Sequence, residues 1–258
     1  MTIGSGVMFW GGLRLAATLL TAVPIPGNTA AHGTPDRRTA AAAMYWAPVI
    51  GLLLGTAAAG VLQACRAGHT GPLLAAVLAV AVLAALTRGL HLDGLADFAD
   101  GLGSRQPASR ALEIMKRSDI GPFGVATIVL TVLVQVSALA RAEQAGRGPV
   151  AIVAAAVTAR LAMMLSCRQR VPSARPDGLG AMVAGTVQPL WGGILVLAAL
   201  AAAGAFGRIY PAAMAIALLI SLALTSLATR RLGGITGDVL GAVAEVAAAA
   251  CLLVTAVS

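Results

Sequence analysis

Residues 39–65 read TAAAAMYWAPVIGLLLGTAAAGVLQAC, a run of 27 residues without one charged side chain. About 20 apolar residues are enough for a helix to cross a hydrocarbon core about 30 Å thick. Inside lipid a segment must satisfy its own backbone hydrogen bonds, which favours a helix. The stretch therefore predicts a membrane-spanning α-helix.

Six further stretches have the same character, and only Arg160 and Glu245 interrupt them. Together they predict an all-α fold, a polytopic integral membrane helix bundle with about seven transmembrane helices. Residues 1–38 are broken by Arg14 and a Pro-Ile-Pro-Gly turn, so we expect an N-terminal interfacial segment. We treat residues 1–258 as a single membrane-embedded domain with a cytoplasmic loop at 88–119. The six stretches are 67–87, 120–140, 148–167, 178–207, 209–229 and 239–258.

The composition excludes several other classes of protein. Of 258 residues, 59% are hydrophobic and 11% charged, and the mean hydropathy is +0.88. Soluble domains carry roughly 25% charged residues, and disordered chains have few apolar ones. Three scattered cysteines do not make a disulfide scaffold. The net charge of +8 follows topology, so the expected partner is a lipid bilayer and not nucleic acid.

The basic residues predict the orientation of the chain. If the N-terminus is cytoplasmic, 13 of the 18 Lys and Arg residues fall on that side and 4 on the other. Such a bias is typical of cytoplasmic loops. Eight of the ten acidic residues lie on the same side, although acids contribute little to topology. We therefore expect a cation-binding active site that opens to the cytoplasm.

The densest group of acids is Asp93, Asp97 and Asp100. At roughly 100° per residue they lie within about 60° of one another on a helix. Three such carboxylates repel one another unless a cation or protons intervene, and hard oxygen donors suit Mg²⁺ or Mn²⁺. The alternative is a solvated helix face, but that predicts basic partners one turn away. Positions 89, 96 and 104 are Gly, Ala and Ser, which favours metal binding.

A second acidic pair, Asp238 and Glu245, stands seven residues apart and therefore on one helix face. It follows a glycine-rich turn that includes Gly237, of the kind that presents backbone N–H groups to a phosphate. Intramembrane ionisable residues are functional by default. Arg160 lies about 12 Å deep at about 1.5 Å per residue. It is interpreted either as the ion-pair partner of Glu245 or as a phosphate ligand.

Three more residues are candidates, and two of them have two interpretations each. Lys116 lies in a basic loop that is either topogenic or in contact with a substrate phosphate. Arg175 belongs to a similar cytoplasmic cluster. His91 is either a structural hydrogen-bond donor or an acid–base residue.

Several motifs resemble the cobalamin synthase family of adenosylcobinamide-GDP ribazoletransferases. They are HLDGLAD at 91–97, DGL at 100–102, LEIMK at 112–116, RPDGLG at 175–180 and GGITGDVLG at 233–241. Arg160 and Glu245 fit the same pattern, and the resemblance covers essentially the whole chain. After the Glu-Ile-Met segment many members of the family read basic, acid, Ser, basic. In this chain Arg117 stands where an acid is usual, and Asp119 stands where a basic residue is usual. Asp119 is therefore not among the expected ligands.

The resemblance implies a bacterial multi-pass enzyme of the plasma (inner) membrane. A ribose hydroxyl of α-ribazole, or of its 5′-phosphate, attacks the cobinamide-linked phosphorus of adenosylcobinamide-GDP, and GMP leaves. We expect Mg²⁺ on Asp93, Asp97, Asp100 and Asp238. The candidate catalytic residues are Asp93, Asp97, His91 and Glu245, and the candidate substrate-binding residues are Arg160, Lys116, Arg175 and Gly237. The identity of the general base and the formation of a homo-oligomer stay open.

Two other functions are weighed against this one. CDP-alcohol phosphotransferases carry Asp-Gly-x-x-Ala-Arg, whereas this chain reads Asp-Gly-Leu-Ala-Asp at 93–97, without the arginine, and lacks the later Gly-x-x-x-Asp-x-x-x-Asp. Cation-coupled transporters place their acids near the bilayer midplane. Here only Glu245 and Arg160 are deep, so a transporter is the less favoured of the two.

Overall fold

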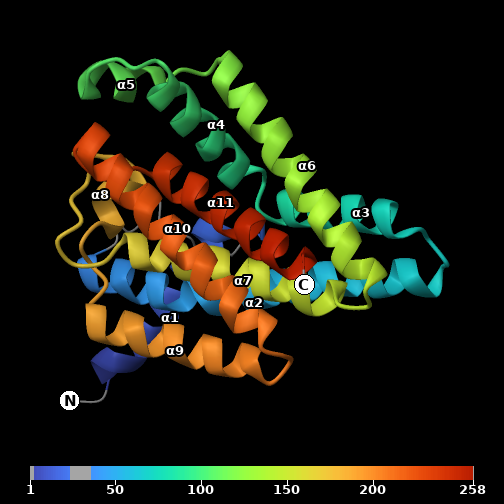
Figure 1. Cartoon of the computed structure of the whole chain (residues 1–258). Helices are drawn as coiled ribbons and strands as arrows, with labels where there is room; N and C mark the ends of the chain where they lie inside the picture. Colours follow the sequence, from blue (N-terminus) through green and yellow to red (C-terminus); the bar gives the residue numbers. More distant parts are fainter. Residues whose placement is uncertain (1–2, 24–35, 258) are drawn as a thin grey trace.

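The computed structural model describes residues 3–23 and 36–257, and this part of the chain is helical throughout apart from turns and two isolated β-bridges. The end of the bundle that carries α4, α5 and α8 lies opposite the connection between α2 and α3 (Figure 1). The described helices are α1 (Ile3–Leu20), α2 (Arg37–Ala67), α3 (Pro72–Leu86), α4 (Leu90–Gly103), α5 (Ala108–Ile114), α6 (Pro122–Gln144), α7 (Gly148–Ser166), α8 (Gly178–Val183), α9 (Pro189–Gly204), α10 (Ile209–Leu232) and α11 (Gly237–Ala256).

The predicted class, a polytopic membrane helix bundle, is confirmed, and five or six candidate spans are found in the described residues where about seven are expected. Within the described residues, α2, α6, α7, α10 and α11 are long and apolar enough to cross a membrane. The count is six if the pair α3 and α4, bent by 87°, forms one broken span. We expected about seven. The difference arises because α3 has only 15 residues and α9 only 16, short of the ~20 that a span needs.

Local chain breakers explain these two short helices. Arg88 and Gly89 both adopt left-handed backbone conformations after α3, with φ of 55° and 66°, and turn the chain into α4. The predicted span at 178–207 is also divided. Gly185 has a φ of 68°, and Pro189 begins α9 at the first helical position, where proline is favoured.

The N-terminal segment contains a helix that packs on α2. Leu15 and Leu20 of α1 are buried, and the position of Gly12 leaves no room for a Cβ beside Ala42. Asp36 caps the start of α2 by accepting a hydrogen bond from the Thr39 N–H at 2.8 Å. Hydrogen bonds from Thr39 also hold the pKa of Asp36 below its usual value. The predicted Pro-Ile-Pro-Gly turn lies outside the described residues, and the interfacial placement of 1–38 stays a prediction.

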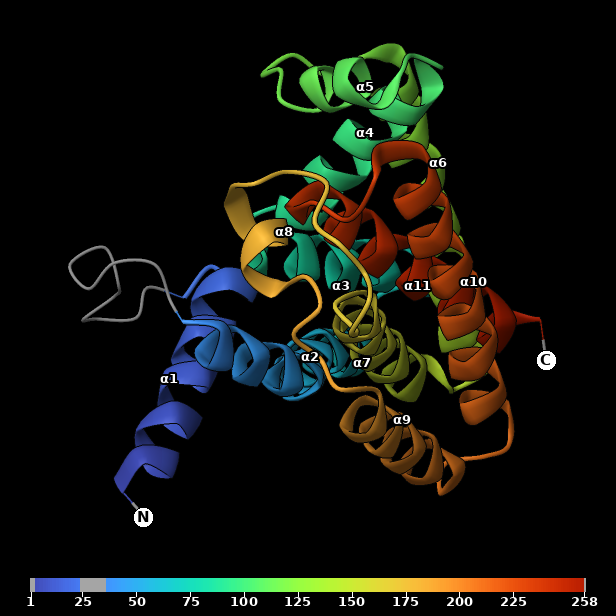
Figure 2. The same cartoon turned by 90° about the vertical axis from the view of Figure 1, so that its left-hand side faces the viewer.

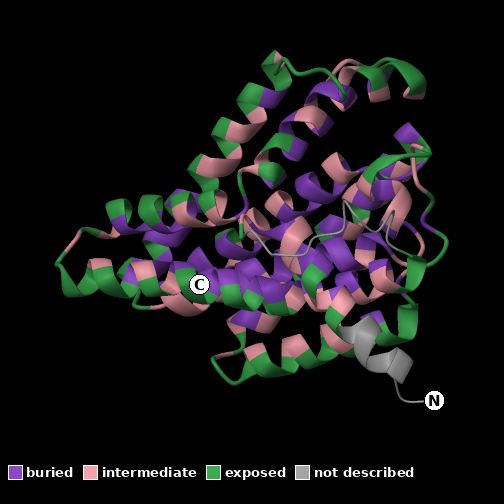
Figure 3. Ribbon diagram, turned by 180° about the vertical axis from the view of Figure 1, so that it is seen from behind, coloured by how far each residue is buried: buried purple, intermediate pink, exposed green. Residues whose placement is uncertain are grey.

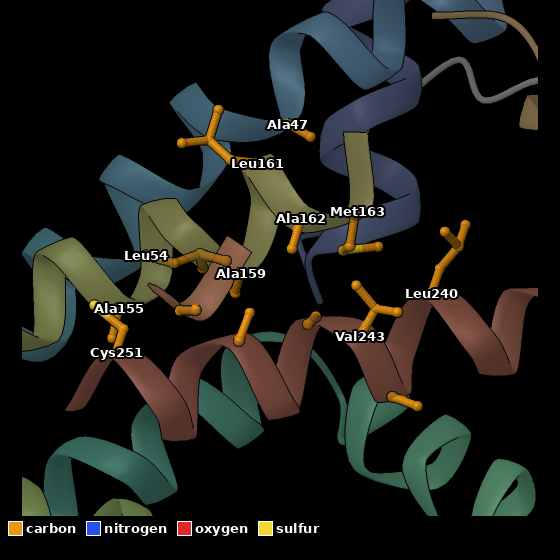
Figure 4. Close-up of a cluster of buried hydrophobic side chains, with 14 of the residues drawn as sticks. Ala47, Leu54, Ala155, Ala159, Leu161, Ala162, Met163, Leu240, Val243 and Cys251 are labelled. Atoms are coloured by element: carbon orange, nitrogen blue, oxygen red, sulfur yellow. The ribbon is translucent and has the colours of Figure 1, made fainter. Parts of the chain in front are cut away.

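The core forms around α7, which lies between α2 and α11 (Figure 4). A Cβ at Gly51 of α2 would come within 2.6 Å of the Ala156 carbonyl oxygen, and one at Gly55 within 2.9 Å of the Val153 Cα. Small residues let helices approach closely in membranes, where packing rather than water drives association. Alanines of α7, such as Ala155 and Ala159, are fully or almost fully buried for the same reason.

The outer surface of the bundle is apolar, as expected of a protein in lipid. Buried residues fill the centre of the molecule and exposed ones cover its periphery (Figure 3). The exposed residues include many large aliphatic side chains, which water would not favour in such number. Examples are Leu53, Leu73, Leu74, Leu130, Leu133, Leu197 and Leu219.

Candidate active site

The acidic stripe of α4 meets the start of α11 because glycines allow the two backbones to touch. A Cβ at Gly94 would lie 2.9 Å from the Cα of Asp238, and one at Gly241 would lie 3.0 Å from the His91 carbonyl oxygen. This crossing places Asp93 and Asp97 beside Asp238. The structure thus brings together three of the four predicted metal ligands from two separate chain segments.

We call Asp93, Asp97 and Asp238 the outer acidic cluster. All three side chains carry charge of the same sign. Asp97 experiences repulsion from Asp93, from Asp238 and from Asp100, and attraction from Arg175. Asp93 is exposed and Asp97 half-buried. Like charges held this close are costly unless a cation or protons join them.

Asp100 is engaged elsewhere. Its carboxylate accepts hydrogen bonds from the backbone N–H groups of Gly121 at 2.7 Å and Gly124 at 2.9 Å. Asp100 therefore caps the N-terminus of α6, where a negative charge is stabilised by the helix dipole. The sequence pattern does not predict this role. The signal was present in the Gly121-Pro122 pair, which is typical of a helix start, but its partner lies 21 residues away.

Arg175 lies at the outer acidic cluster and connects three segments of the chain. Arg175 Nη1 lies 3.3 Å from Asp238 Oδ2, and Arg175 Nη2 donates to the Leu112 carbonyl oxygen of α5 at 2.8 Å. Its Nε is buried without a hydrogen-bond partner among the described residues. Thr236 Oγ1 also donates to Asp238 Oδ2, at 3.1 Å. The predicted substrate-binding residue Arg175 is thus placed at the acids.

Lys116 lies nearby but is held loosely. Its Nζ is 3.6 Å from Asp177 Oδ2, and both side chains are more than half exposed. Such surface pairs contribute only about 0–1 kcal/mol. Lys116 is therefore free to exchange Asp177 for another anion.

The glycine-rich turn before α11 is fixed by the segment that precedes α8. Ile235 N–H donates to the Pro172 carbonyl oxygen at 2.9 Å, and Ala174 N–H donates to the Ile235 carbonyl oxygen at 3.0 Å. Position 234 requires glycine because a Cβ there would clash with the Pro172 backbone. Gly237 has no such constraint, since a Cβ there would be in ordinary contact with Leu179. Its predicted contact with substrate stays a prediction.

The remaining candidates form a second group deeper in the bundle. His91, Arg160 and Glu245 line a cavity of about 50 Å³ between the helices, with Gln135 and otherwise mainly aliphatic side chains. We call this the inner cavity (His91, Gln135, Arg160 and Glu245). Gln135 Nε2 donates to Glu245 Oε2 at 2.7 Å. Sequence analysis missed Gln135, because a lone glutamine in an apolar helix has no distinguishing pattern.

Arg160 is buried and Gly51 makes room for it, since a Cβ at position 51 would lie 2.8 Å from the Arg160 Cγ. Its Nε has no hydrogen-bond partner among the described residues. Among the ion pairs of this part of the chain, none joins Arg160 to Glu245, although the two charges attract each other across the cavity. The group is electrically balanced, unlike the outer acidic cluster.

The outer acidic cluster has the donor chemistry of a divalent-cation site without a closed cage. Within residues 3–23 and 36–257, no three His, Cys, Asp or Glu side chains already converge in metal-binding geometry. Asp93, Asp97 and Asp238 nevertheless offer only hard oxygen donors, which Mg²⁺ prefers together with water and substrate phosphates. Metal binding stays a prediction for these three residues.

All of these groups except the inner cavity lie toward one end of the bundle. Figure 2 views that end, with α8 and the segment before it in front of the helices and α4 and α5 above them. The fold and this cluster define a polytopic membrane protein with a carboxylate site at one end of the helix bundle.

Comparison with known proteins identifies the family. The cobalamin-5-phosphate synthase family model matches residues 12–256. An adenosylcobinamide-GDP ribazoletransferase of Frankia casuarinae is 45% identical over 95% of this chain and 94% of its own length. Proteins of the same name from a Nocardioides species and from Bradyrhizobium diazoefficiens are 41% and 40% identical, over 93% and 95% of this chain and 96% and 92% of their own lengths.

The chain belongs to the cobalamin-5-phosphate synthase family. The predicted resemblance and the prediction of an enzyme, a transferase, are therefore confirmed. No solved structure matches the chain.

Proposed function

We propose that this protein joins adenosylcobinamide-GDP to α-ribazole or α-ribazole 5′-phosphate and releases GMP. Membership of the family and the names of its relatives support the substrates. The observation that carries the chemistry is the outer acidic cluster at one end of the bundle. The concentration of basic residues at that edge supports a cytoplasmic opening in the plasma membrane.

The reaction transfers a phosphoryl group between oxygen atoms. A ribose hydroxyl forms a bond to the cobinamide-linked phosphorus, the bond from that phosphorus to the GMP oxygen breaks, and the hydroxyl proton passes to a carboxylate of the protein. Asp93 and Asp97 are the candidates for that base because Asp93 is exposed and Asp97 is only half-buried beside it. Catalysis of this kind depends mainly on positioning and on neutralising charge.

The protein's own residues have separate tasks in this proposal. Asp93, Asp97 and Asp238 would hold Mg²⁺, which when bound neutralises charge on a diphosphate. Arg175 has an unused Nε and lies at the same acids, so it would bind a phosphoryl oxygen. Lys116 would contribute a second positive charge. His91, Arg160 and Glu245 belong to the inner cavity, where they would stabilise the packing of α4 against α11.

The direct test is an assay of the purified chain in lipid vesicles with the GDP-activated corrinoid and α-ribazole. We expect GMP and the joined corrinoid to appear in equal amounts, with Mg²⁺ and not with EDTA. α-Ribazole 5′-phosphate in a parallel reaction decides the preferred acceptor. GMP release without a joined product, or equal turnover in EDTA, would contradict the proposal.

A further inference from the structure

A second pocket lies between the end of α4 and the end of α10. It has a volume of about 260 Å³ and is lined by Leu102, Arg105, Leu227 and Arg231. It therefore combines two cationic heads with an apolar wall. Neither arginine side chain makes an ion pair or hydrogen bond with another residue in the part of the chain that the structure describes.

The backbone at Arg105 is held in an unusual conformation. Its φ of 52° is left-handed, a region that non-glycine residues rarely adopt. Ser104 stabilises the turn, because its Oγ donates to the Gly101 carbonyl oxygen at 2.7 Å and accepts from the Gln106 N–H at 3.3 Å. Strained residues of this kind concentrate at binding sites. Here the turn directs Arg105 to the pocket that Arg231 lines from α10.

This pocket is separate from the outer acidic cluster. At roughly 100° per residue, Leu102 lies about 140° around α4 from Asp97 and about 180° from Asp93. The two sites therefore occupy different faces of one helix. The acids do not neutralise Arg105 and Arg231, which stay available to an external anion.

The pocket continues onto a face of α10 that is suited to lipid. Ile216, Ile220 and Leu227 are each 42–43% exposed and share one helix face, and Arg231 follows one turn after Leu227. The aliphatic stripe can pack against an acyl chain of a lipid, and the two arginines at its end can bind the phosphate of the headgroup. The pocket lining includes no aromatic side chain on which a nucleobase would stack, which disfavours a nucleotide.

We propose that Leu102, Arg105, Leu227 and Arg231 form a binding site for an anionic phospholipid of the cytoplasmic leaflet, with its phosphate between the two arginines. The leaflet rests on the orientation given under the proposed function, whereas the lipid chemistry does not. A bound lipid would join α4, which carries Asp93 and Asp97, to α10. The composition of the membrane would then affect the order of the acid-bearing helix.

Lipid binding by the whole protein tests this site. The chain is purified in non-ionic detergent, titrated with dioleoyl phosphatidylglycerol or dioleoyl phosphatidylcholine, and followed by native mass spectrometry and thermal unfolding. Each arginine near a lipid surface contributes about 1 kcal/mol, so R105Q/R231Q should bind phosphatidylglycerol about thirty-fold more weakly. R105K/R231K should keep most of the affinity and shows that the fold tolerates change at both positions.

The control is R230Q, which removes one positive charge from the neighbouring position of α10, outside the pocket lining, and should weaken binding far less than R105Q/R231Q does. Phosphatidylcholine should bind weakly and equally to all variants. Equal phosphatidylglycerol affinity in R105Q/R231Q and R230Q would overturn the proposal. Displacement of the lipid by GDP would also overturn it, because the pocket would then serve a nucleotide phosphate.

Discussion

The outer acidic cluster and the inner cavity both hold ionisable side chains of α4 and α11, but they balance charge differently. In the outer cluster Asp93, Asp97 and Asp238 face a single arginine. In the inner cavity Glu245 accepts a hydrogen bond from Gln135 and faces Arg160. Charges that the fold leaves unbalanced indicate a ligand from outside, whereas charges that it balances indicate a structural role. The comparison predicts opposite consequences of mutation in the two regions.

The largest expected effect is on the outer cluster. D93A should reduce transfer at least about a thousand-fold, equivalent to about 4 kcal/mol of transition-state stabilisation, because it removes a ligand and a candidate base together. Membrane insertion and the thermal midpoint should stay unchanged. Rates of GMP release in vesicles measure the effect. The control is D119A, which removes an exposed acid outside the cluster and should retain activity within about threefold. Near-normal turnover of D93A would end the assignment.

The helix crossing that assembles the cluster is open to a second test. In G94A the new Cβ would lie 2.9 Å from the Asp238 Cα, so α4 must move away from α11. Overpacking of this kind costs about 1–3 kcal/mol, and we expect transfer to fall about a hundred-fold. G60A is the matched control, since a Cβ at Gly60 of α2 meets no atom within 4 Å. Equal activities of the two variants would show that the close crossing does not matter.

Mutations in the inner cavity should lower the stability of the protein more than its turnover. R160M leaves Glu245 without its opposing charge, and loss of a buried polar partner costs about 1–3 kcal/mol. We expect a lower thermal midpoint and less inserted protein, while turnover per folded molecule stays within about tenfold. The double variant R160M/E245Q should recover part of the midpoint. If R160M instead kept its midpoint and lost all turnover, Arg160 would be a substrate ligand and the contrast between the regions would fail.

The smallest expected effect belongs to Lys116. Its pairing with Asp177 is exposed on both sides and is weak by itself, so K116A should leave stability unchanged. A long-range contribution to binding of the diphosphate should appear as a rise in KM of about threefold to fivefold that disappears at high salt. A change in kcat that salt does not affect would indicate a direct role in the reaction instead.

Sequence patterns were sufficient for the helical class and for the placement of two acids of the candidate site on one helix face. The charge-free stretch at 39–65 became α2, and the spacing of Asp93 and Asp97 placed both carboxylates on one side of α4. Apolar composition does not say where a helix ends, so the division between α8 and α9 was missed although Gly185 and Pro189 mark it. The capping of α6 by Asp100 and the contact of Gly94 with Asp238 join distant segments, which periodicity does not report.

Sequence motifs predict the family, whereas the grouping of the acids depends on how the helices pack. The motifs at 91–97 and 233–241 were enough to predict the family, which is confirmed. They did not separate the outer acidic cluster from the inner cavity, because Glu245 and Arg160 belong to the same motif set as the outer acids. Only the crossing of α4 and α11 shows which acids lie together.

The central claim is that Asp93, Asp97 and Asp238 share a divalent cation. Electron paramagnetic resonance of Mn²⁺ with the full chain in detergent tests it without the reaction. The unaltered chain and D119N should bind one tight Mn²⁺, D97N and D238N should each lose it, and D100N should keep it. Tight Mn²⁺ binding that survives D97N and D238N, or that only D100N removes, would contradict the claim.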